Sequence, residues 1–402
     1  MTEKQNTPEI RFEGFTDPWE QRKLGEFGSV AMCKRIYKEQ TSEQGDVPFF
    51  KIGTFGADPD AFISDELFED FKRAYPYPTP GTLLVSAAGS IGRVVEYQGE
   101  KAYFQDSNIV WLEHDQRLND AFLKPLYSQI EWGLEGSTIK RLYNKDLLSA
   151  EVTIPDGREQ KEIGQFFGKL DNLITLHQRK YDKLYTVKKS MLDKMFPKPG
   201  ETEPEIRFEG FTDPWEQRKL GELCTISKGH GYSKADIRDA GAPLILYGRL
   251  YTQYESRIKN VDTFAVEQEG SLLSKGNEVI VPASGETAED IAVASSVRRS
   301  GIIFGGDLNV VTPVSKLDPD YIALAITYSK AHDDLAKRAQ GKSVVHVHGN
   351  DIAEVEIPYP SASEQKRIST VVLGLDSLIT LHQRKLELLR NIKKSLLDRM
   401  FV

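Results

Sequence analysis

The chain has 402 residues, more than a single hydrophobic core usually holds, so two or more domains are expected. Hydrophobic residues make up 39%, aromatic residues 10% and charged residues 28%, which excludes a mainly disordered or collagen-like chain. The net charge of −8, from 52 basic and 60 acidic side chains, argues against a broadly basic nucleic-acid binder. Any DNA-binding site must therefore be a local patch of basic residues on an otherwise acidic chain.

The cysteine content and the apolar runs point to the compartment. Two cysteines, Cys33 and Cys224, are too few for a disulfide framework or a four-ligand zinc site on their own. The first residues lack the apolar stretch of an export signal, and no run of about 18 apolar residues occurs. We therefore expect a cytoplasmic protein.

The chain repeats itself, with different sequences between the repeated blocks. EIRFEGFTDPWEQRKLGE at 9–26 recurs letter for letter at 205–222, and two further blocks recur with changes. These pair EQKEIGQFFGKLDNLITLHQRK (159–180) with EQKRISTVVLGLDSLITLHQRK (364–385), and KKSMLDKMF (188–196) with KKSLLDRMF (393–401). Each half is thus predicted to be one variable globule between shared segments. The predicted parts are an N-terminal globule (1–158), a helix (159–196), a linker (197–204), a second globule (205–363) and a second helix (364–402).

The variable globules are predicted to be mixed α/β with short strands. Apolar and β-branched runs punctuated by Gly, Pro and Ser occur at 82–97, 107–113, 278–286 and 301–314. Helical windows follow at 119–135 and 318–339.

The shared C-terminal block of each half is predicted to be one long helix. Bulky side chains recur at three-four spacing over about five heptads without proline, and Pro197 follows the first run. The predicted seam and docking positions include Ile163, Phe167, Leu170, Ile174, Leu184, Ile368, Val372, Leu375, Ile379 and Leu389. A helix of about 57 Å with such an apolar seam needs a second helix to pack against. The short linker favours antiparallel pairing with the other copy, although packing of each helix on another protein stays open.

No convincing catalytic or metal site emerges from the motifs. The chain has no [DNS]-P-P-[FYW] tetrapeptide of an amino-methyltransferase and no glycine-rich cofactor loop. Gln340–Ser343 resembles part of a phosphate-binding loop, but Ala336 stands where the first glycine is required. His346 and His348 lack a third metal ligand, and His177 and His382 fit polar positions in the helix seam.

The duplicated blocks resemble those of the specificity subunit of type I restriction-modification systems, a family with a role in phage defence. The resemblance rests on FTDPWEQRKLGE, on the two LITLHQRK helices and on the IP-to-EQK joins at 154–161 and 357–366, and it covers nearly the whole chain. It implies an α+β fold with two target recognition domains joined by two long antiparallel coiled-coil helices in a pseudo-two-fold repeat. Each domain would read one half of an interrupted double-stranded DNA site, with the coil as spacer.

The resemblance also implies the partners. This chain would be non-catalytic and hold no cofactor or metal. Two methyltransferase subunits would use S-adenosylmethionine for adenine-N6 methylation, and two restriction subunits would use ATP and Mg for translocation and cleavage.

Candidate DNA-reading residues lie in corresponding loops of the two halves. Arg, Lys, Asn and His side chains in such loops can hydrogen-bond to base edges, although solvated loops would look the same. The candidates are Lys51, Thr54, Ser90, Arg93, Lys140, Arg141, Tyr143, Asn144 and Lys145 in the first half, and Arg249, Ser284, Lys342, Ser343, His346, His348 and Asn350 in the second. Trp19 and Trp215 lie in identical blocks and cannot distinguish two half-sites, so they are expected to dock the coil or a partner.

Two other interpretations remain open at this point. A self-contained methylase-nuclease is disfavoured by the missing motifs. A coiled-coil scaffold whose globules bind proteins would differ in selecting no DNA sequence.

Overall fold

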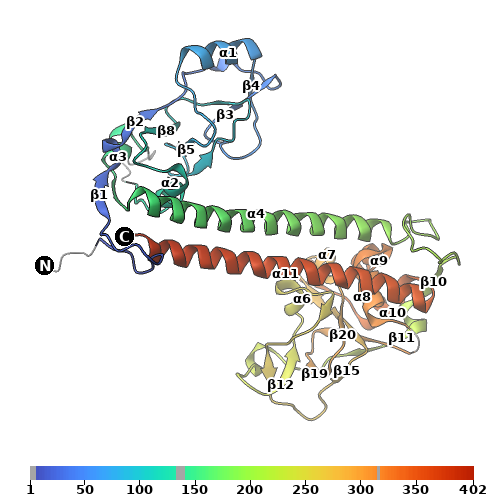
Figure 1. Cartoon of the computed structure of the whole chain (residues 1–402). Helices are drawn as coiled ribbons and strands as arrows, with labels where there is room; N and C mark the ends of the chain where they lie inside the picture. Colours follow the sequence, from blue (N-terminus) through green and yellow to red (C-terminus); the bar gives the residue numbers. More distant parts are fainter. Residues whose placement is uncertain (1–5, 133–140, 315–316) are drawn as a thin grey trace. The chain divides into compact units, whose positions relative to one another are not determined.

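The computed structural model describes residues 6–132, 141–314 and 317–402. The chain divides into two compact units (Figure 1), one made of residues 1–177 and 385–402, the other of residues 178–384. Both long helices therefore begin in one unit and end in the other. The domain borders predicted from the repeat follow the duplicated blocks, whereas the compact units divide each helix near its middle.

The first unit contains a variable globule and two stretches of long helix. Its elements are β1 (Glu20–Lys23), η1 (Leu24–Glu26), β2 (Gly28–Ala31), η2 (Lys38–Gln40), β3 (Val47–Phe50), β4 (Phe62–Ile63), α1 (Asp65–Ala74), β5 (Leu83–Ser86), β6 (Val94–Glu96), β7 (Tyr103–Phe104), β8 (Ile109–His114), α2 (Asp120–Tyr127), α3 (Asn144–Ser149), β9 (Glu151–Ile154) and the start of α4 (Gly157–Lys194). One antiparallel sheet has the order β2-β8-β5-β6, and a second has the order β4-β3-β7, with β3 and β7 parallel.

The second unit repeats this topology on a different sequence. Its elements are β10 (Glu216–Lys219), α5 (Leu220–Leu223), β11 (Cys224–Lys228), η3 (Lys234–Asp236), β12 (Ala242–Ile245), α6 (Arg249–Thr252), β13 (Arg257–Ile258), β14 (Phe264–Ala265), β15 (Leu273–Lys275), β16 (Glu278–Pro282), β17 (Ser284–Gly285), α7 (Ala288–Ile291), β18 (Ser295–Val297), β19 (Ser300–Phe304), β20 (Leu308–Pro313), α8 (Pro319–Tyr328), α9 (Lys330–Arg338), β21 (Val345–His346), α10 (Gly349–Ala353), β22 (Glu356–Tyr359) and the start of α11 (Ala362–Met400). The order β11-β20-β16-β18 matches β2-β8-β5-β6 of the other unit, with β13 added at the edge. The order β14-β12-β19 matches β4-β3-β7, with β15 added at the edge and again with one parallel pair. The prediction of two mixed α/β globules is confirmed.

Some predicted boundaries are wrong for local reasons. The helix expected over 119–135 ends as α2 at Tyr127. The helix expected over 318–339 is two helices, because the Ser329 hydroxyl accepts a hydrogen bond from the Ala331 amide and caps the second one. The run at 82–97 agrees with the prediction of short strands punctuated by glycine, because it forms two strands joined by a turn in which Gly89 and Gly92 have positive φ.

The repeated blocks anchor each globule to the first turn of its long helix. Arg11 forms two 2.7 Å hydrogen bonds with the buried Glu159 carboxylate, and the Trp19 indole donates to the same carboxylate at 3.2 Å. Arg207 and Trp215 contact Glu364 in the same way, at 2.8 to 3.1 Å. We call each of these arginine–tryptophan–glutamate clusters a joint. The identical segments therefore form the same joint in both halves.

Within each unit, one stretch of α4 lies antiparallel to one stretch of α11 (Figure 1). In the first unit the Lys393 ammonium lies 2.6 Å from the Asp171 carboxylate, and in the second Lys188 lies 2.5 Å from Asp376. Both pairs have the same register, because Lys188 follows Asp171 by 17 residues in α4 and Lys393 follows Asp376 by 17 residues in α11. The predicted antiparallel pairing of the two copies is confirmed inside each unit.

The end of each long helix completes the core of the unit it reaches. Phe401, after α11, packs against Trp19, Phe122 and Phe167 in the first unit. Phe196, after α4, belongs to the core of the second unit and packs against Tyr321. The phenylalanine of the repeated Met-Phe sequence at each helix end thus packs into the hydrophobic core of the unit that the helix reaches.

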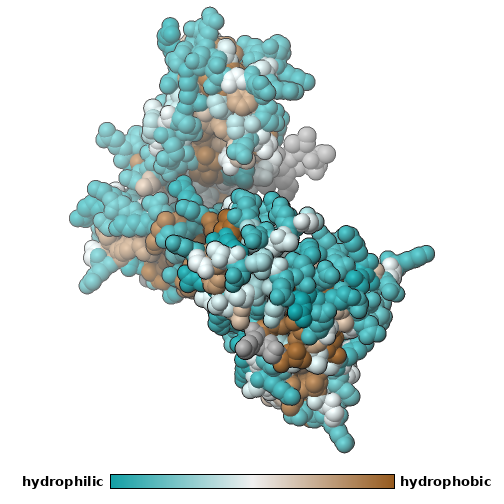
Figure 2. All heavy atoms as spheres, turned by 90° about the vertical axis from the view of Figure 1, so that its right-hand side faces the viewer, coloured by the Kyte–Doolittle hydropathy of each residue, from teal (hydrophilic) through white to brown (hydrophobic). Residues whose placement is uncertain are grey.

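Most of the surface in view in Figure 2 is hydrophilic, with smaller hydrophobic areas between. Several leucines of the long helices are nevertheless about half exposed, at equivalent places in the two copies. They are Leu173 and Leu176 in the first copy and Leu378 and Leu381 in the second. In the part of the chain that the structure describes, no helix is both long and apolar enough to cross a membrane.

Candidate nucleic-acid interface

The loops of the first globule gather at one edge of its two sheets. β2, β3, β5 and β7 all end at this edge, and β8 begins there, as the pairs Phe50–Phe104 and Ser86–Ile109 show. We give the name loop face of the first unit to three segments together: residues 51–57 after β3, residues 87–93 after β5, and residues 141–146, which lie beside the second segment and lead into α3. The corresponding loop face of the second unit consists of residues 246–254, 283–286 and 340–350.

Hydrogen bonds hold the three loops of the first unit together. The exposed Arg93 donates from its guanidinium to the Phe55 carbonyl at 2.6 Å, which joins the first two loops. The Leu142 amide donates to the Ala87 carbonyl at 2.9 Å, which joins the second loop to the third. Four residues predicted from three separate segments, Thr54, Ser90, Arg93 and Arg141, are thereby brought onto one face.

The other candidates of the first unit lie on the same loops. The Thr54 hydroxyl closes a turn by accepting a hydrogen bond from the Lys51 amide at 3.2 Å, and the Lys51 ammonium lies 2.9 Å from the Asp60 carboxylate. Tyr143 is 47% exposed, and the Lys145 ammonium lies over its ring. Asn144 opens α3 and is exposed. Lys140 lies outside the described residues.

The loop face of the second unit has the same construction. Strand β17 pairs with β21, so that Ser284 lies opposite His346, with Ser284 Oγ 3.0 Å from His346 Nδ1. The Tyr251 hydroxyl donates to the Ser284 carbonyl at 2.5 Å and joins the loop after β12 to this pair. Lys342, Ser343, His348 and Asn350 are exposed on the last loop. A cleft of about 1440 Å³ lies between these loops.

Backbone contacts establish which positions correspond between the two faces. The Leu142 amide donates to the Ala87 carbonyl, and the Val347 amide donates to the Ala283 carbonyl. One residue further, the Tyr143 amide bonds to the Asp146 carboxylate and the His348 amide to the Asp351 carboxylate, both at 3.0 Å. Arg141 therefore corresponds to His346, Tyr143 to His348 and Lys145 to Asn350. The two faces present different side chains on the same backbone.

Arg249 differs from the other candidates because its charge is already paired. Its guanidinium contacts the carboxylates of Asp262 and Glu255 at 2.8 and 3.0 Å, and its side chain is only 11% exposed. In this structure Arg249 connects α6 to the loop that follows it. Its predicted contact with DNA would require the ion pairs with Asp262 and Glu255 to break.

A further basic and aromatic loop, which is not among the predicted DNA-reading segments, lies at the same edge of the first unit. It follows β2 and contains Lys34, Arg35 and Tyr37, and the Tyr37 side chain is 56% exposed. The Arg35 guanidinium lies 3.7 Å from Asp106, and the Tyr103 hydroxyl donates to the Lys34 carbonyl. The signal was present in the sequence as KRIYK, because interleaved basic and aromatic residues suit a nucleic-acid backbone and its bases.

The predicted docking residues have two different surroundings. Trp19, Trp215, Ile163, Phe167, Ile368 and Val372 are buried in the globule cores. Leu170 is buried, and Ile174, Leu184, Leu375, Ile379 and Leu389 are half buried along the helices. The tryptophans thus join each globule to its own coil helix through Glu159 and Glu364.

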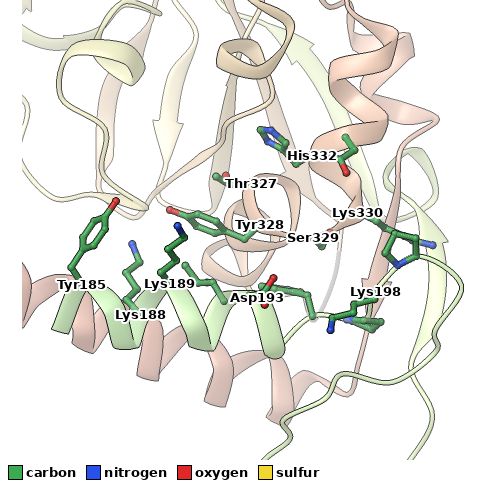
Figure 3. A pocket seen from close by; sticks show the side chains of 15 residues that line it. Tyr185, Lys188, Lys189, Asp193, Lys198, Thr327, Tyr328, Ser329, Lys330 and His332 are labelled. Carbon is green, nitrogen blue, oxygen red and sulfur yellow. The ribbon is translucent and has the colours of Figure 1, made fainter. Parts of the chain in front are cut away.

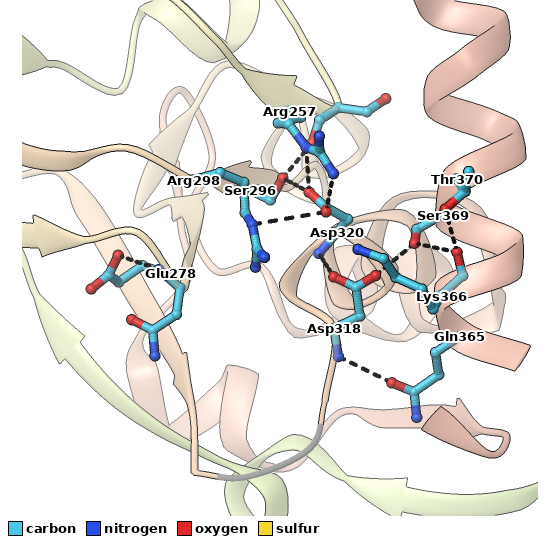
Figure 4. A network of polar contacts seen from close by, with 12 residues as sticks. Arg257, Glu278, Ser296, Arg298, Asp318, Asp320, Gln365, Lys366, Ser369 and Thr370 are labelled. Carbon is cyan, nitrogen blue, oxygen red and sulfur yellow. Dashed lines mark hydrogen bonds and ion pairs between the residues drawn. The ribbon is translucent and has the colours of Figure 1, made fainter. Parts of the chain in front are cut away.

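The ionisable groups away from the loop faces show structural partners. Burial raises the pKa of Cys33 and of Cys224 to about 12, so neither thiol is a ready nucleophile. The buried Asp320 accepts hydrogen bonds from Arg257 and Ser296 (Figure 4). Although burial opposes its ionisation, these bonds hold the pKa of Asp320 below its ordinary value. This network fastens β13 and β18 to α8.

A recess of about 560 Å³ in the second unit also lacks the parts of an enzyme site (Figure 3). Lys188, Lys198 and Lys330 line it, each within 4.0 Å of a carboxylate: Asp376, Glu205 and Glu356 respectively. The His332 Nδ1 atom lies 2.8 Å from the Ala292 carbonyl oxygen. Within the described residues, no group of three His, Cys, Asp or Glu side chains could hold a metal ion. Gln340–Ser343 forms part of a tight hairpin and does not open a helix, so it is no phosphate loop.

Comparisons with known proteins agree with this geometry. The family described as Type I restriction modification DNA specificity domain matches residues 16–186 and 212–391. A putative type I restriction enzyme specificity subunit of Haemophilus influenzae is 50% identical over 152 residues, which are 37% of this chain and 40% of that protein. The type I restriction enzyme MjaVIII specificity subunit of Methanocaldococcus jannaschii is 20% identical over 72% of this chain and 68% of that protein. The crystal structure of a type I restriction-modification S subunit from M. genitalium has the same fold, with a TM-score of 0.68 at 16% identity over 98% of this chain and 99% of that one.

Proposed function

The chain belongs to the type I restriction-modification DNA specificity family, and we propose that each of its two loop faces reads one half of an interrupted double-stranded DNA site. The observation that carries this proposal is the equivalence of the two faces. They share a backbone framework but differ at the corresponding exposed positions of the last loop, where Arg141, Tyr143 and Lys145 are replaced by His346, His348 and Asn350. Two half-sites of different sequence require two such faces.

The acidic total charge fits a subunit that binds DNA as part of a complex. The second loop face carries Glu286, Glu289 and Asp290 near its cleft, and these repel phosphate groups. Carboxylates can still accept hydrogen bonds from cytosine N4 in the major groove. We therefore expect weak DNA binding by the isolated chain and strong, salt-dependent binding by the assembled complex.

The paired helices supply the spacer and the docking surface in this proposal. The half-exposed Leu173 and Leu176 and their equivalents Leu378 and Leu381 offer two similar apolar surfaces, one for each of two methyltransferase subunits. Those subunits would contribute S-adenosylmethionine and adenine-N6 chemistry. Two restriction subunits would contribute ATP, Mg and cleavage, so that this cytoplasmic subunit supplies recognition and no catalysis.

The experiment is selection of DNA by the complex. The chain, co-purified with a compatible methyltransferase subunit, is incubated with random duplex DNA, and the bound DNA is sequenced. Enrichment of two fixed base sets separated by an unspecified gap supports the proposal. A complex that forms but enriches no sequence would contradict it and would favour a protein-binding scaffold.

A further inference from the structure

We propose that Arg141 and His346 are the corresponding specificity-determining residues of the two halves, and that Arg141 reads a guanine through the major groove. The inference rests on the proposed function and assigns base contacts within it. It starts from the position of the two residues, each placed one residue before a buried anchor, Leu142 or Val347.

Strand geometry directs both side chains outward. Successive side chains of an extended chain point to opposite faces. Leu142 is 4% exposed and Val347 is 0% exposed, so each points into its globule. Arg141 and His346, immediately before them, are exposed. Each is also bridged to the neighbouring loop, Arg141 to Ala88 and His346 to Ser284, which fixes the backbone from which the side chain projects.

Arg141 differs from the other two arginines of the loop faces, because within residues 6–132, 141–314 and 317–402 its guanidinium makes no hydrogen bond or ion pair. Arg93 donates to the Phe55 carbonyl, and Arg249 is held by two carboxylates. A guanidinium that is free of internal ion pairs can present its planar pair of N–H groups to another molecule. Guanine offers the matching O6 and N7 acceptors in the major groove, and this pairing is bidentate.

His346 presents a smaller and differently oriented group at the equivalent position. Its Nδ1 lies 3.0 Å from Ser284 Oγ, and the Tyr251 hydroxyl in turn holds the Ser284 carbonyl. One ring nitrogen is therefore occupied, and Nε2 remains for a single hydrogen bond. A single bond cannot reproduce the two-point contact of arginine with guanine, so His346 selects its base by a different contact from that of Arg141.

The test maps adenine methylation in a methylation-free host that expresses a compatible methyltransferase subunit with the wild-type chain, Arg141→Lys, Arg141→Gln or His346→Ala. Lysine keeps the charge but loses the planar fork, and glutamine removes the charge. We expect both Arg141 variants to relax one guanine position of one half-site and to leave the other half-site intact. His346→Ala should relax the other half-site alone. Arg158→Lys, at an exposed arginine of α4 outside the loop faces, is the matched control and should leave the motif unchanged.

A second readout tests the groove and the base directly. Replacing the assigned guanine with 7-deazaguanine removes the N7 acceptor from the major groove only. The wild-type complex should lose about tenfold in affinity, whereas the Arg141→Gln complex should lose almost nothing further.

Three results would overturn the inference. A mapped wild-type motif whose half-sites contain no G·C pair would exclude the guanine contact. An unchanged motif with both folded Arg141 variants would show that Arg141 reads no base, while the proposed function would stand. Absence of any motif with the wild-type chain, in a complex shown to form, would remove the proposed function itself and this inference with it.

Discussion

At the scale of single residues, the repeated joint between arginine, tryptophan and glutamate explains why the opening segments are identical. Glu159 is fully buried and lies in the first turn of α4, where the positive end of the helix dipole also favours a carboxylate. Arg11 and Trp19 satisfy both of its oxygens, and its hydrogen bond to Arg11 raises the pKa of that guanidinium. Such a joint tolerates little change, since either partner would be left buried and unpaired.

Removal of the negative charge of Glu159 should therefore lower the stability of the first unit. Glu159→Gln leaves the Arg11 guanidinium without its counter-ion, and we expect a loss of about 2 to 3 kcal/mol in the unfolding free energy of the first unit. Glu364→Gln should destabilise the second unit similarly. Denaturant titration measures both effects, and Glu20→Gln, at an exposed ion pair, is the control expected to change little. Equal stability of Glu159→Gln and Glu20→Gln would contradict this account of the joint.

A histidine pair predicts a pH dependence of the first unit. His114 Nε2 lies 3.0 Å from the Asp120 carboxylate, and this hydrogen bond raises the pKa of His114 above its ordinary value of 6.5. A raised pKa means that the folded state favours the protonated ring, so the stabilisation is complete below about pH 6.5 and is lost as the pH rises through the raised value. The difference in unfolding free energy between wild type and Asp120→Asn should be larger at pH 6 than at pH 8.5. An identical difference at both pH values would show that the pair contributes nothing by ionisation.

At the scale of elements, the sequence predicts the helices better than the sheets. The three-four spacing, the absence of proline and Pro197 place α4 and α11 within two residues of their observed ends, because helical signals are local. The shared sheet topology was not predictable, since β12 must find β19 nearly sixty residues later and the two globules differ in sequence. For the same reason, the burial of Arg249 depends on Glu255 and Asp262, whose positions the local sequence does not give.

The candidate DNA-reading site, like the fold, could be predicted from the sequence only in part. In the sequence, GSTIKRLYNKD (136–146) aligns with GKSVVHVHGND (341–351) and places Arg141 opposite His346. The backbone hydrogen bonds of Leu142 and Val347 give the same correspondence. What the sequence could not show is that loops from three distant segments converge, or that the loop after β2 joins them.

The ends of the long helices give the third prediction. Phe401 is 8% exposed in the core of the first unit, and Phe196 is 3% exposed in that of the second. Phe401→Ala should destabilise the first unit by about 3 kcal/mol and leave the second unit unchanged, whereas Phe196→Ala should do the reverse. Hydrogen exchange followed by peptide measures the two units separately. Loss of protection in both units from either variant would contradict the separate cores.

The fourth prediction concerns the paired helices as a spacer. One heptad inserted after Gln178 in α4 and another after Lys385 in α11 keeps the register that pairs Asp171 with Lys393 and Lys188 with Asp376. The insertion lengthens the pair by about 10 Å, equivalent to about three base pairs. Methylation mapping should return the same half-sites with a longer gap. An unchanged gap in an active complex would show that the helices do not set the spacing.

At the scale of the whole molecule, the duplication separates what is constant from what varies. The opening segments, the helix starts and the terminal phenylalanines recur because each half builds the same joint, the same antiparallel contact and the same packing of a phenylalanine into a core. The loop faces can differ because the buried joint, the antiparallel contact and the terminal phenylalanines use none of their side chains. If each loop face reads one half-site, as we propose, substitutions in one globule should change one half of the target without refolding the other globule.

The most direct test of this account is adenine-methylation mapping by long-read sequencing in a methylation-free host that expresses a compatible methyltransferase subunit, with and without this chain. The account predicts a bipartite, interrupted motif that appears only when the chain is present. A methyltransferase that is expressed and co-purifies with the chain, yet leaves no sequence-specific methylation, would contradict it.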